Sequence, residues 1–198
     1  EETTDASNNV IKESTYLSGK VITETTETDG TVTTETVEAN GETTTVEVST
    51  DASNNTITKT TPPSGTITTT TVDPSGNTLL TVVESTDASG NDVAVSTFAS
   101  GTVSTATTTP AGDTTTVEES TDASGNDVVK TIFPSTIVII VTTLDDNDTK
   151  TESFDIYGNK TTVVTDTDAS GNVTTTTTDF NGNATSVITD ASGNVLVD

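Results

Sequence analysis

The chain has 198 residues and a formal net charge of −25, with 31 Asp and Glu against 6 Lys, and it contains no Arg, His, Cys, Met or Trp. So few cations exclude nucleic acid and anionic membrane surfaces as partners, because both are bound through patches of basic side chains. Without His and Cys, the common general bases, nucleophiles and transition-metal ligands are missing. We therefore predict that the chain is not an enzyme.

Threonine is the commonest residue, and together with Val, Ser, Gly, Asn and Asp it makes up most of the chain. The β-branched side chains of Thr and Val favour strands, and the strong helix formers are scarce. High acidity with few aromatic residues can also indicate disorder. Here, however, the charges recur at regular intervals between runs with high strand propensity. The composition therefore predicts a folded all-β protein.

A short motif, Asp-Ala-Ser-Gly-Asn or a variant with Asn in place of Gly, recurs along the chain with looser copies between its occurrences. Aligned on the Gly position, the copies are mostly 11 residues apart, and four steps lengthen to 13 or 14. An internal period of this kind is typical of repeat architectures. The motif begins at Asp5, Asp51, Asp87, Asp122, Asp168 and Asp190, and the longer steps end at Asn54, Gly90, Gly125 and Gly171.

The residues of one copy, Asp73-Pro74-Ser75-Gly76, match a type I turn. Asp at the first position can accept backbone N–H groups, and Pro at the second supplies the required φ near −65°. A Gly in the left-handed region then closes a three-residue hairpin loop. The remaining residues of each period are enough for one strand. We expect about seventeen strands, and positive φ angles at Gly76, Gly90, Gly125, Gly171 and Gly182.

The predicted architecture is therefore all-β, with short strands at a period of about 11 residues joined by tight turns. The strands form a β-meander, a sandwich-like arrangement or a β-solenoid array. In chain order, we predict an N-terminal segment (1–8), a first seven-strand unit (9–90), a second seven-strand unit (91–171) and a C-terminal hairpin with a terminal strand (172–198).

The Asp-x-x-Gly-Asn turns ahead of Thr/Val strands, clearest from Asp155 to Asp198, resemble the hairpin repeats of bacterial Rhs/YD surface proteins. The 11-residue half-period and the Gly-Asn turns are also similar to those of curli-type, Thr-rich prokaryotic filament and sheath proteins. These resemblances imply a repetitive all-β protein of the cell surface. The regular tyrosines of the Rhs/YD repeats are absent, as are the regular Gln residues and inward aromatics of curli.

Oxygen ligands of the kind that Ca²⁺ prefers gather in several of the predicted turns. The spacing is not that of an EF-hand loop, and the same residues are also typical of solvated hairpin turns. A calcium site and simple turn chemistry both remain open. The candidate metal ligands are Asp87, Asn91, Asp92, Asp122, Asn126, Asp127, Asp145, Asp146 and Asp148.

Two apolar segments are candidates for assembly. The run Ile137, Val138, Ile139, Ile140 and Val141 is apolar at every position, which is typical of a strand covered on both faces. It is either the most buried strand of its own domain or a strand shared with a neighbouring subunit.

The second segment, Val195, Leu196 and Val197, is not followed by another turn. It either pairs with the preceding hairpin and stops there, or it adds to a sheet of another copy.

Five Asn-x-Ser/Thr sequons fall at turn positions, where they would be accessible to a glycosylation enzyme. Such sequons also arise by chance in a Thr-rich chain. The candidate acceptors are Asn54, Asn147, Asn159, Asn172 and Asn183.

Hydrophobic residues are 28% of the chain, well below the ~45–50% of ordinary domains. Burial within one chain would then struggle to offset backbone entropy. We expect a structural subunit of a prokaryotic extracellular filament, sheath or surface fibre, polymerising with copies of itself by strand addition.

Two other functions fit the same composition. One is a stalk or shell segment of an adhesin or toxin-like surface protein. The other is an ice-binding protein, since Thr66, Thr68 and Thr70 form a Thr-x-Thr row. An extracellular location fits a chain that begins at Glu1, as a mature form would after removal of a secretion signal. No apolar run is long enough to insert into a membrane.

Overall fold

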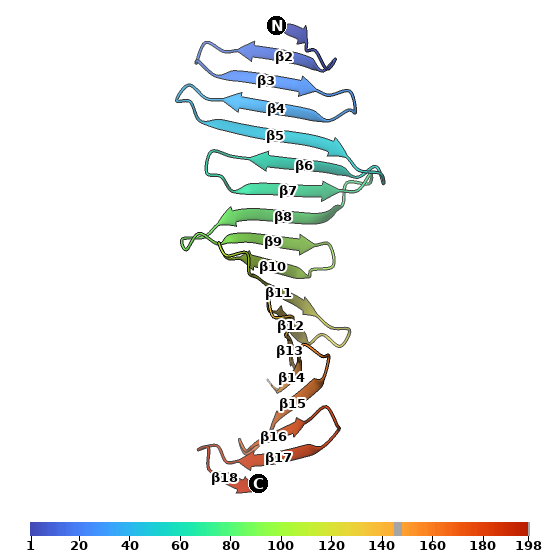
Figure 1. The fold of residues 1–198 in the computed structure, drawn as a ribbon, viewed down its shortest axis with the longest axis vertical. Helices are drawn as coiled ribbons and strands as arrows, with labels where there is room; N and C mark the ends of the chain where they lie inside the picture. Colours follow the sequence, from blue (N-terminus) through green and yellow to red (C-terminus); the bar gives the residue numbers. More distant parts are fainter. Residues whose placement is uncertain (145–147, 198) are drawn as a thin grey trace. The chain divides into compact units, whose positions relative to one another are not determined.

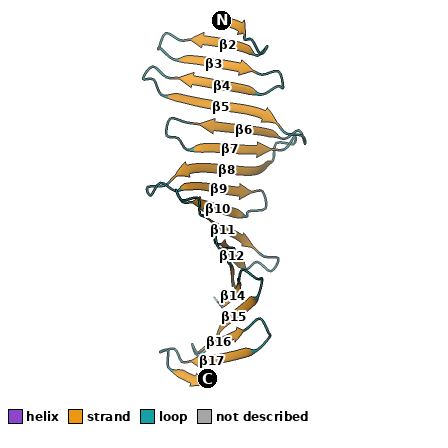
Figure 2. Ribbon diagram, in the orientation of Figure 1, coloured by secondary structure: helices purple, strands orange, loops and turns teal. Residues whose placement is uncertain are grey.

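The computed structural model describes residues 1–144 and 148–197, and within them every regular element is a β-strand (Figure 2). The chain divides into two compact units, Glu1–Ser100 (unit 1) and Gly101–Asp198 (unit 2). Each unit is a sheet one layer thick (Figure 1). The prediction of an all-β fold of short strands joined by turns is confirmed. Among the described residues, no helix could cross a membrane.

Unit 1 holds the strands β1 (Glu2–Thr4), β2 (Val10–Thr15), β3 (Val21–Thr26), β4 (Val32–Val37), β5 (Thr43–Thr50), β6 (Thr56–Thr61), β7 (Ile67–Val72), β8 (Thr78–Thr86) and β9 (Asp92–Phe98). Unit 2 holds β10 (Val103–Thr108), β11 (Thr114–Thr121), β12 (Asp127–Ile132), β13 (Val138–Thr143), β14 (Thr149–Phe154), β15 (Lys160–Thr167), β16 (Val173–Thr178), β17 (Ala184–Thr189) and β18 (Val195–Val197).

The strands of each unit form a meander, in which each strand pairs antiparallel with the next one along the chain. Of the predicted arrangements, the meander of hairpins within one chain is therefore the one observed. The two units divide between Ser100 and Gly101, in the segment that follows β9. The finer boundaries expected from the long steps, at residues 8, 90 and 171, remain a prediction.

The described turns are closed by a residue in the left-handed region, as the sequence predicts. In the turn that begins at Asp73, the Gly76 N–H donates to the Asp73 carbonyl (3.0 Å), and the Asp73 N–H donates to the Asn77 carbonyl (2.9 Å). Gly76 has φ +90°. The positive φ angles predicted for Gly76, Gly90, Gly125, Gly171 and Gly182 are all confirmed.

Among the described turns, three place a residue other than Gly at this left-handed position. Asn8 and Asn54 have φ angles of 65° and 61°, which Asn tolerates because its short side chain bonds locally. Thr136, with φ 64°, is a β-branched residue in the same conformation. A β-branched residue is a genuine outlier in this region, so the turn at Thr136 is strained.

The symmetry of these turns fixes which face of the sheet each residue occupies. Paired residues lie directly opposite each other and share a face, while successive residues of a strand alternate between faces. Val10 pairs with Thr26 and Thr26 with Val32, so the even-numbered residues of these strands share one face. The same parity runs from β1 to β7 in unit 1 and from β10 to β17 in unit 2.

The four longer steps of the repeat lengthen strands rather than turns. The strands β5, β11 and β15 have 8 residues and β8 has 9. Two added residues shift the next hairpin along the strand and preserve the faces. The 14-residue step adds three residues, and one of them, Leu79, forms a bulge in the β7–β8 pairing. On either side of it Val72 pairs with Thr78 and Thr71 with Leu80. The carbonyl of Leu79, the bulged residue, accepts the Ala99 N–H (2.9 Å).

The described part of the chain contains no buried side chain, apolar or polar. The expectation that Ile137–Val141 forms a strand covered on both faces is therefore wrong within one chain. The side chains of Val138–Val141 are only half-buried in β13, and Ile137 is 38% exposed. A sheet one layer thick has no second layer to cover either face, so the weak hydrophobic composition is matched by the absence of a core.

Candidate functional site

Nine of the described turns carry the same cluster of hydrogen bonds around an Asp carboxylate, which we name the Asp–Asn clamp. In the turn at Asp73, one carboxylate oxygen accepts the N–H groups of Ser75 and Asn77, both at 2.8 Å. The other oxygen accepts the Asn77 side-chain amide at 2.9 Å. The clamp ties the first residue of the turn to the fifth. The turns that carry it begin at Asp5, Asp51, Asp73, Asp87, Asp122, Asp155, Asp168, Asp179 and Asp190.

These hydrogen bonds stabilise the ionised carboxylate. The side-chain amide and backbone N–H of Asn77 lower the pKa of Asp73 below its ordinary value of 3.8. At Asp5 and Asp51 the backbone N–H of the fifth residue is the largest cause of the lowered pKa. Because donors to a carboxylate favour its charged form, the clamp carboxylates are ionised in the folded chain.

The residues predicted to bind calcium occupy such turns. The carboxylate oxygens of Asp87 and Asp122 bond to the amides of Asn91 and Asn126 in their own clamps. Asp92 accepts the Thr86 hydroxyl at 3.3 Å. Asp127 pairs with Thr121 at the start of β12.

The third predicted calcium cluster is only partly within the described residues. The Asp148 carboxylate accepts the Thr167 N–H at 2.8 Å, whereas Asp145 and Asp146 lie outside the described residues. Across residues 1–144 and 148–197, no three acidic side chains converge on one point as a metal site requires. The calcium assignment stays a prediction.

The sequons lie in turns, as predicted, with the exception of Asn147, which is outside the described residues. Asn54 is exposed at the left-handed position of its turn. The side-chain amides of Asn159, Asn172 and Asn183 each donate to the Asp of a clamp at 2.8 Å. A glycan on these three amides would have to share the nitrogen with that hydrogen bond. Glycosylation itself remains a prediction.

Two residues of the predicted C-terminal assembly segment are exposed. Val195 and Leu196 are 61% and 55% exposed. Within unit 2, β18 pairs with β17 through Thr189↔Val195 and Ile188↔Val197. The segment thus pairs with the preceding hairpin, and strand addition to another copy could use only its other edge.

The two faces of unit 1 differ in charge from β4 to β9. The pairing register places all five charged residues of these six strands on one face: Glu35, Glu47, Lys59, Glu84 and Asp92. We name this the charged face. The opposite face holds only Thr, Val and Ser, and we name it the neutral face. Two ladders of paired residues cross it: Val32–Val48–Thr58–Thr70–Thr81–Thr97 and Thr34–Val46–Thr60–Thr68–Val83–Val95.

Unit 2 repeats this division from β13 to β17. The charged residues of these five strands, Lys150, Glu152, Lys160 and Asp166, share the even-numbered face. The odd-numbered face holds only Thr, Val, Ile and Ser and is the neutral face of unit 2. Its two ladders are Val141–Thr151–Val163–Thr177–Thr185 and Thr143–Thr149–Thr165–Thr175–Val187.

The division is not complete in every strand. Lys12 and Glu24 pair with each other on the even-numbered face of β2 and β3. In unit 2, Glu119 and Asp127 lie on the odd-numbered face of β11 and β12. The neutral faces are therefore continuous only over the strands named above.

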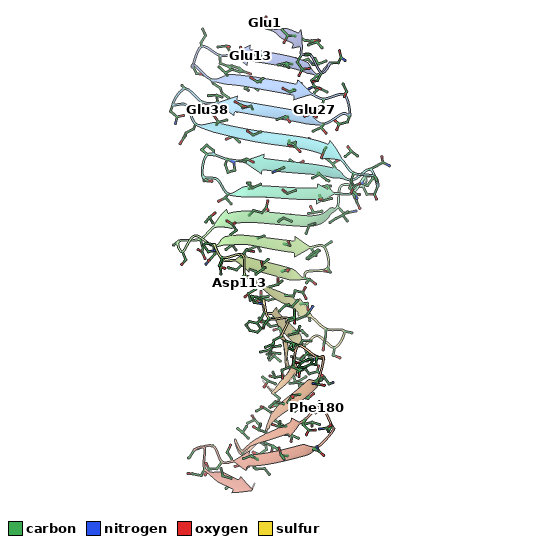
Figure 3. All side chains as sticks on the ribbon, in the orientation of Figure 1. Glu1, Glu13, Glu27, Glu38, Asp113 and Phe180 are labelled. Carbon is green, nitrogen blue, oxygen red and sulfur yellow. The ribbon has the colours of Figure 1, made fainter. Side chains whose placement is uncertain are left out.

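Ion pairs lie on the even-numbered face of unit 2. Lys130 contacts its register partner Glu118 (2.8 Å), and Glu152 contacts both Lys150 (3.1 Å) and Lys160 (2.9 Å). The hydrogen bonds from Lys160 and then Lys150 lower the pKa of Glu152. A shallow depression beside this cluster reaches Phe180, which is 62% exposed at its turn (Figure 3).

The neutral face was missed in the analysis of the sequence. Hydrophobicity does not alternate along these strands, because Thr occupies both faces. The useful signal is the position of the charges within each strand: Glu35, Glu47 and Lys59 are all odd-numbered in a repeat whose turns preserve parity.

No protein-family model matches the chain, and no curated protein sequence matches it significantly.

Proposed function

We propose that this protein is a structural subunit that assembles with copies of itself into an extracellular filament, sheath or surface fibre. The observation that carries the proposal is the absence of any buried side chain in the described residues, although every described strand pairs with a neighbour in a sheet. Such a sheet gains backbone hydrogen bonds but little hydrophobic burial. Association with further copies supplies the missing burial.

The accessible surface gives this argument a magnitude. The chain exposes 12295 Å² at a mass of 20.2 kDa. A typical folded monomer of this mass exposes ~8,800 Å², and its unfolded chain ~29,000 Å². Folding here thus removes about 58% of the unfolded surface, which is the level of a 60-residue domain, instead of about 70%. The surplus of roughly 3,500 Å² is more than the ~800 Å² that each partner contributes to a standard interface.

Backbone groups for growth by strand addition are present in both units. Within unit 1, β1 pairs only with β2, and within unit 2, β18 pairs only with β17. A strand with one paired side presents a row of N–H and C=O groups to another chain. Joining unlike edges of successive copies is a head-to-tail contact, which propagates into a filament rather than closing as a dimer.

Electron microscopy and sedimentation of the purified chain test the proposal. We expect fibres or large assemblies whose amount rises with protein concentration. Removing residues 194–198, which include β18, should leave the circular dichroism of a β-protein but reduce fibre formation. A wild-type chain that stays monomeric at every concentration contradicts the proposed function, whereas normal fibres from the shortened chain contradict only the role of β18.

A further inference from the structure

We propose that two copies of this chain stack face to face through their neutral faces, so that the assembled form is two sheets thick. The inference rests on the proposed function, because it identifies which surface of an assembling chain is covered by a second copy. It concerns the faces of the sheets, whereas strand addition concerns their edges. The two contacts are at right angles and can coexist in one fibre.

Charge decides which face can be covered. A buried charge without a partner is costly, whereas Thr, Val and Ser carry none. Stacking of two charged faces of unit 1 would bring Glu35, Glu47 and Glu84 of each copy toward the same carboxylates of the other, with Lys59 as the only cation among the charged residues of β4–β9. Stacking of two neutral faces has no such repulsion.

The side chains of the neutral face also suit close approach. In each ladder, Thr and Val have nearly the same size, so the surface varies little in height from strand to strand. Stacked sheets of this kind lie about 10 Å apart. The whole chain, over both faces and all edges, exposes roughly 3,500 Å² more than a typical monomer of its mass, whereas an obligate interface takes about 1,000–2,500 Å² from each partner.

Burial of the Thr hydroxyls requires hydrogen-bond partners, since an unsatisfied buried hydroxyl is unfavourable. The register of the sheet can provide them. Elsewhere in unit 2, paired hydroxyls bond across strands, with Thr176 to Ser186 at 2.8 Å and Thr108 to Thr114 at 2.9 Å. Paired Thr residues such as Thr58 and Thr70 stand in the same register relation on the neutral face.

Adjacent residues of one strand supply a matched test. Thr70 lies on the neutral face and Thr69 on the charged face, and both belong to β7. We expect Thr70→Lys to weaken self-association of the full chain at least tenfold in analytical ultracentrifugation, although it lowers the net negative charge. Thr69→Lys should change it less than twofold. The pair Thr175→Lys and Thr176→Lys repeats the comparison on β16 of unit 2.

X-ray fibre diffraction separates this inference from the proposed function. Strand addition gives the spacing of about 4.7 Å between strands, and face-to-face stacking adds one of about 10 Å. Wild-type fibres should show both, and Thr70→Lys fibres should lose the 10 Å reflection.

Fibres without that reflection in the wild type overturn the stacking and leave the proposed function standing, as does equal weakening by both β7 variants. A wild-type chain that never associates overturns both. Ice shaping by dispersed monomers that do not stack would assign the neutral face to ice and overturn the inference.

Discussion

The strained turn at Thr136 offers a test in which a surface substitution raises stability. Thr136 has φ 64°, whereas thirteen turns place Gly at the same position. The left-handed conformation costs roughly 1–2 kcal/mol for a residue with a Cβ atom. Gly removes this strain but gains about 0.5–1 kcal/mol of unfolded-state entropy relative to Ala. We therefore expect Thr136→Gly to raise the free energy of unfolding by about 0.5–1 kcal/mol.

Thr136→Asn should raise stability by a similar or larger amount, because Asn tolerates the conformation without the entropy of Gly. The mirror change is Gly125→Thr, at the other end of β12. An added Cβ at Gly125 meets no atom within 4 Å, so the Cβ itself introduces no clash and the backbone conformation (φ +91°) opposes the substitution. Thermal unfolding followed by circular dichroism should shift by about 2–4 °C per kcal/mol, upward for the two Thr136 variants and downward for Gly125→Thr. Unchanged or lower midpoints for both Thr136 variants would refute the strain at this turn.

Three further predictions concern charge. The clamp carboxylates have pKa values below 3.8 in the folded chain, so their stabilisation is complete above the unfolded value and is lost as the pH falls through the lower folded value. The urea concentration at the midpoint of unfolding should therefore decrease as the pH is lowered from 5 to 2. An increase over this range would contradict the prediction. Asp73→Ala should lower the thermal midpoint by about 2–4 °C more than the control Asp113→Ala. The control removes the same charge from a turn that begins with Thr109 and has no clamp. Equal shifts would mean that the clamp contributes nothing to stability. Glu152→Gln should destabilise by about 0.5–1 kcal/mol at low salt, because Lys150 and Lys160 lose their shared partner. That loss should shrink at 1 M salt, where the Debye length is about 3 Å, and a salt-independent loss would point to packing instead.

The turns and the strands between them could be predicted from the sequence, because each turn depends on a few neighbouring residues. An Asp followed three residues later by Gly, as in Asp122 and Gly125, specifies a turn from the physics of five residues. Repetition of that turn at a fixed step then specifies strand length and antiparallel order. The fold follows because each interaction lies between neighbours in the chain, so no distant contact had to be guessed.

The burial of individual strands could not be predicted in the same way. Five consecutive apolar residues at Ile137–Val141 normally indicate a strand between two layers. The sequence of one strand does not reveal whether a second layer exists, and the described residues of this chain form none. The neutral faces escaped notice for a related reason, since the faces differ in charge and hardly in hydrophobicity.

Each regular turn is centred on a residue, so paired residues differ by an even number and the parity of a residue determines its face. The repeat therefore has a frame of two residues, comparable to the reading frame of codons. An insertion of two residues, as in β5, β11 and β15, stays in frame and leaves every later side chain on its original face. An insertion of one or three residues would exchange the faces of all strands that follow. The 14-residue step contains such an insertion of three residues, and the bulge at Leu79 compensates for it, so that the later strands keep their faces. Repeats of this design can therefore lengthen by pairs of residues at will, whereas each odd change has to be accompanied by a bulge.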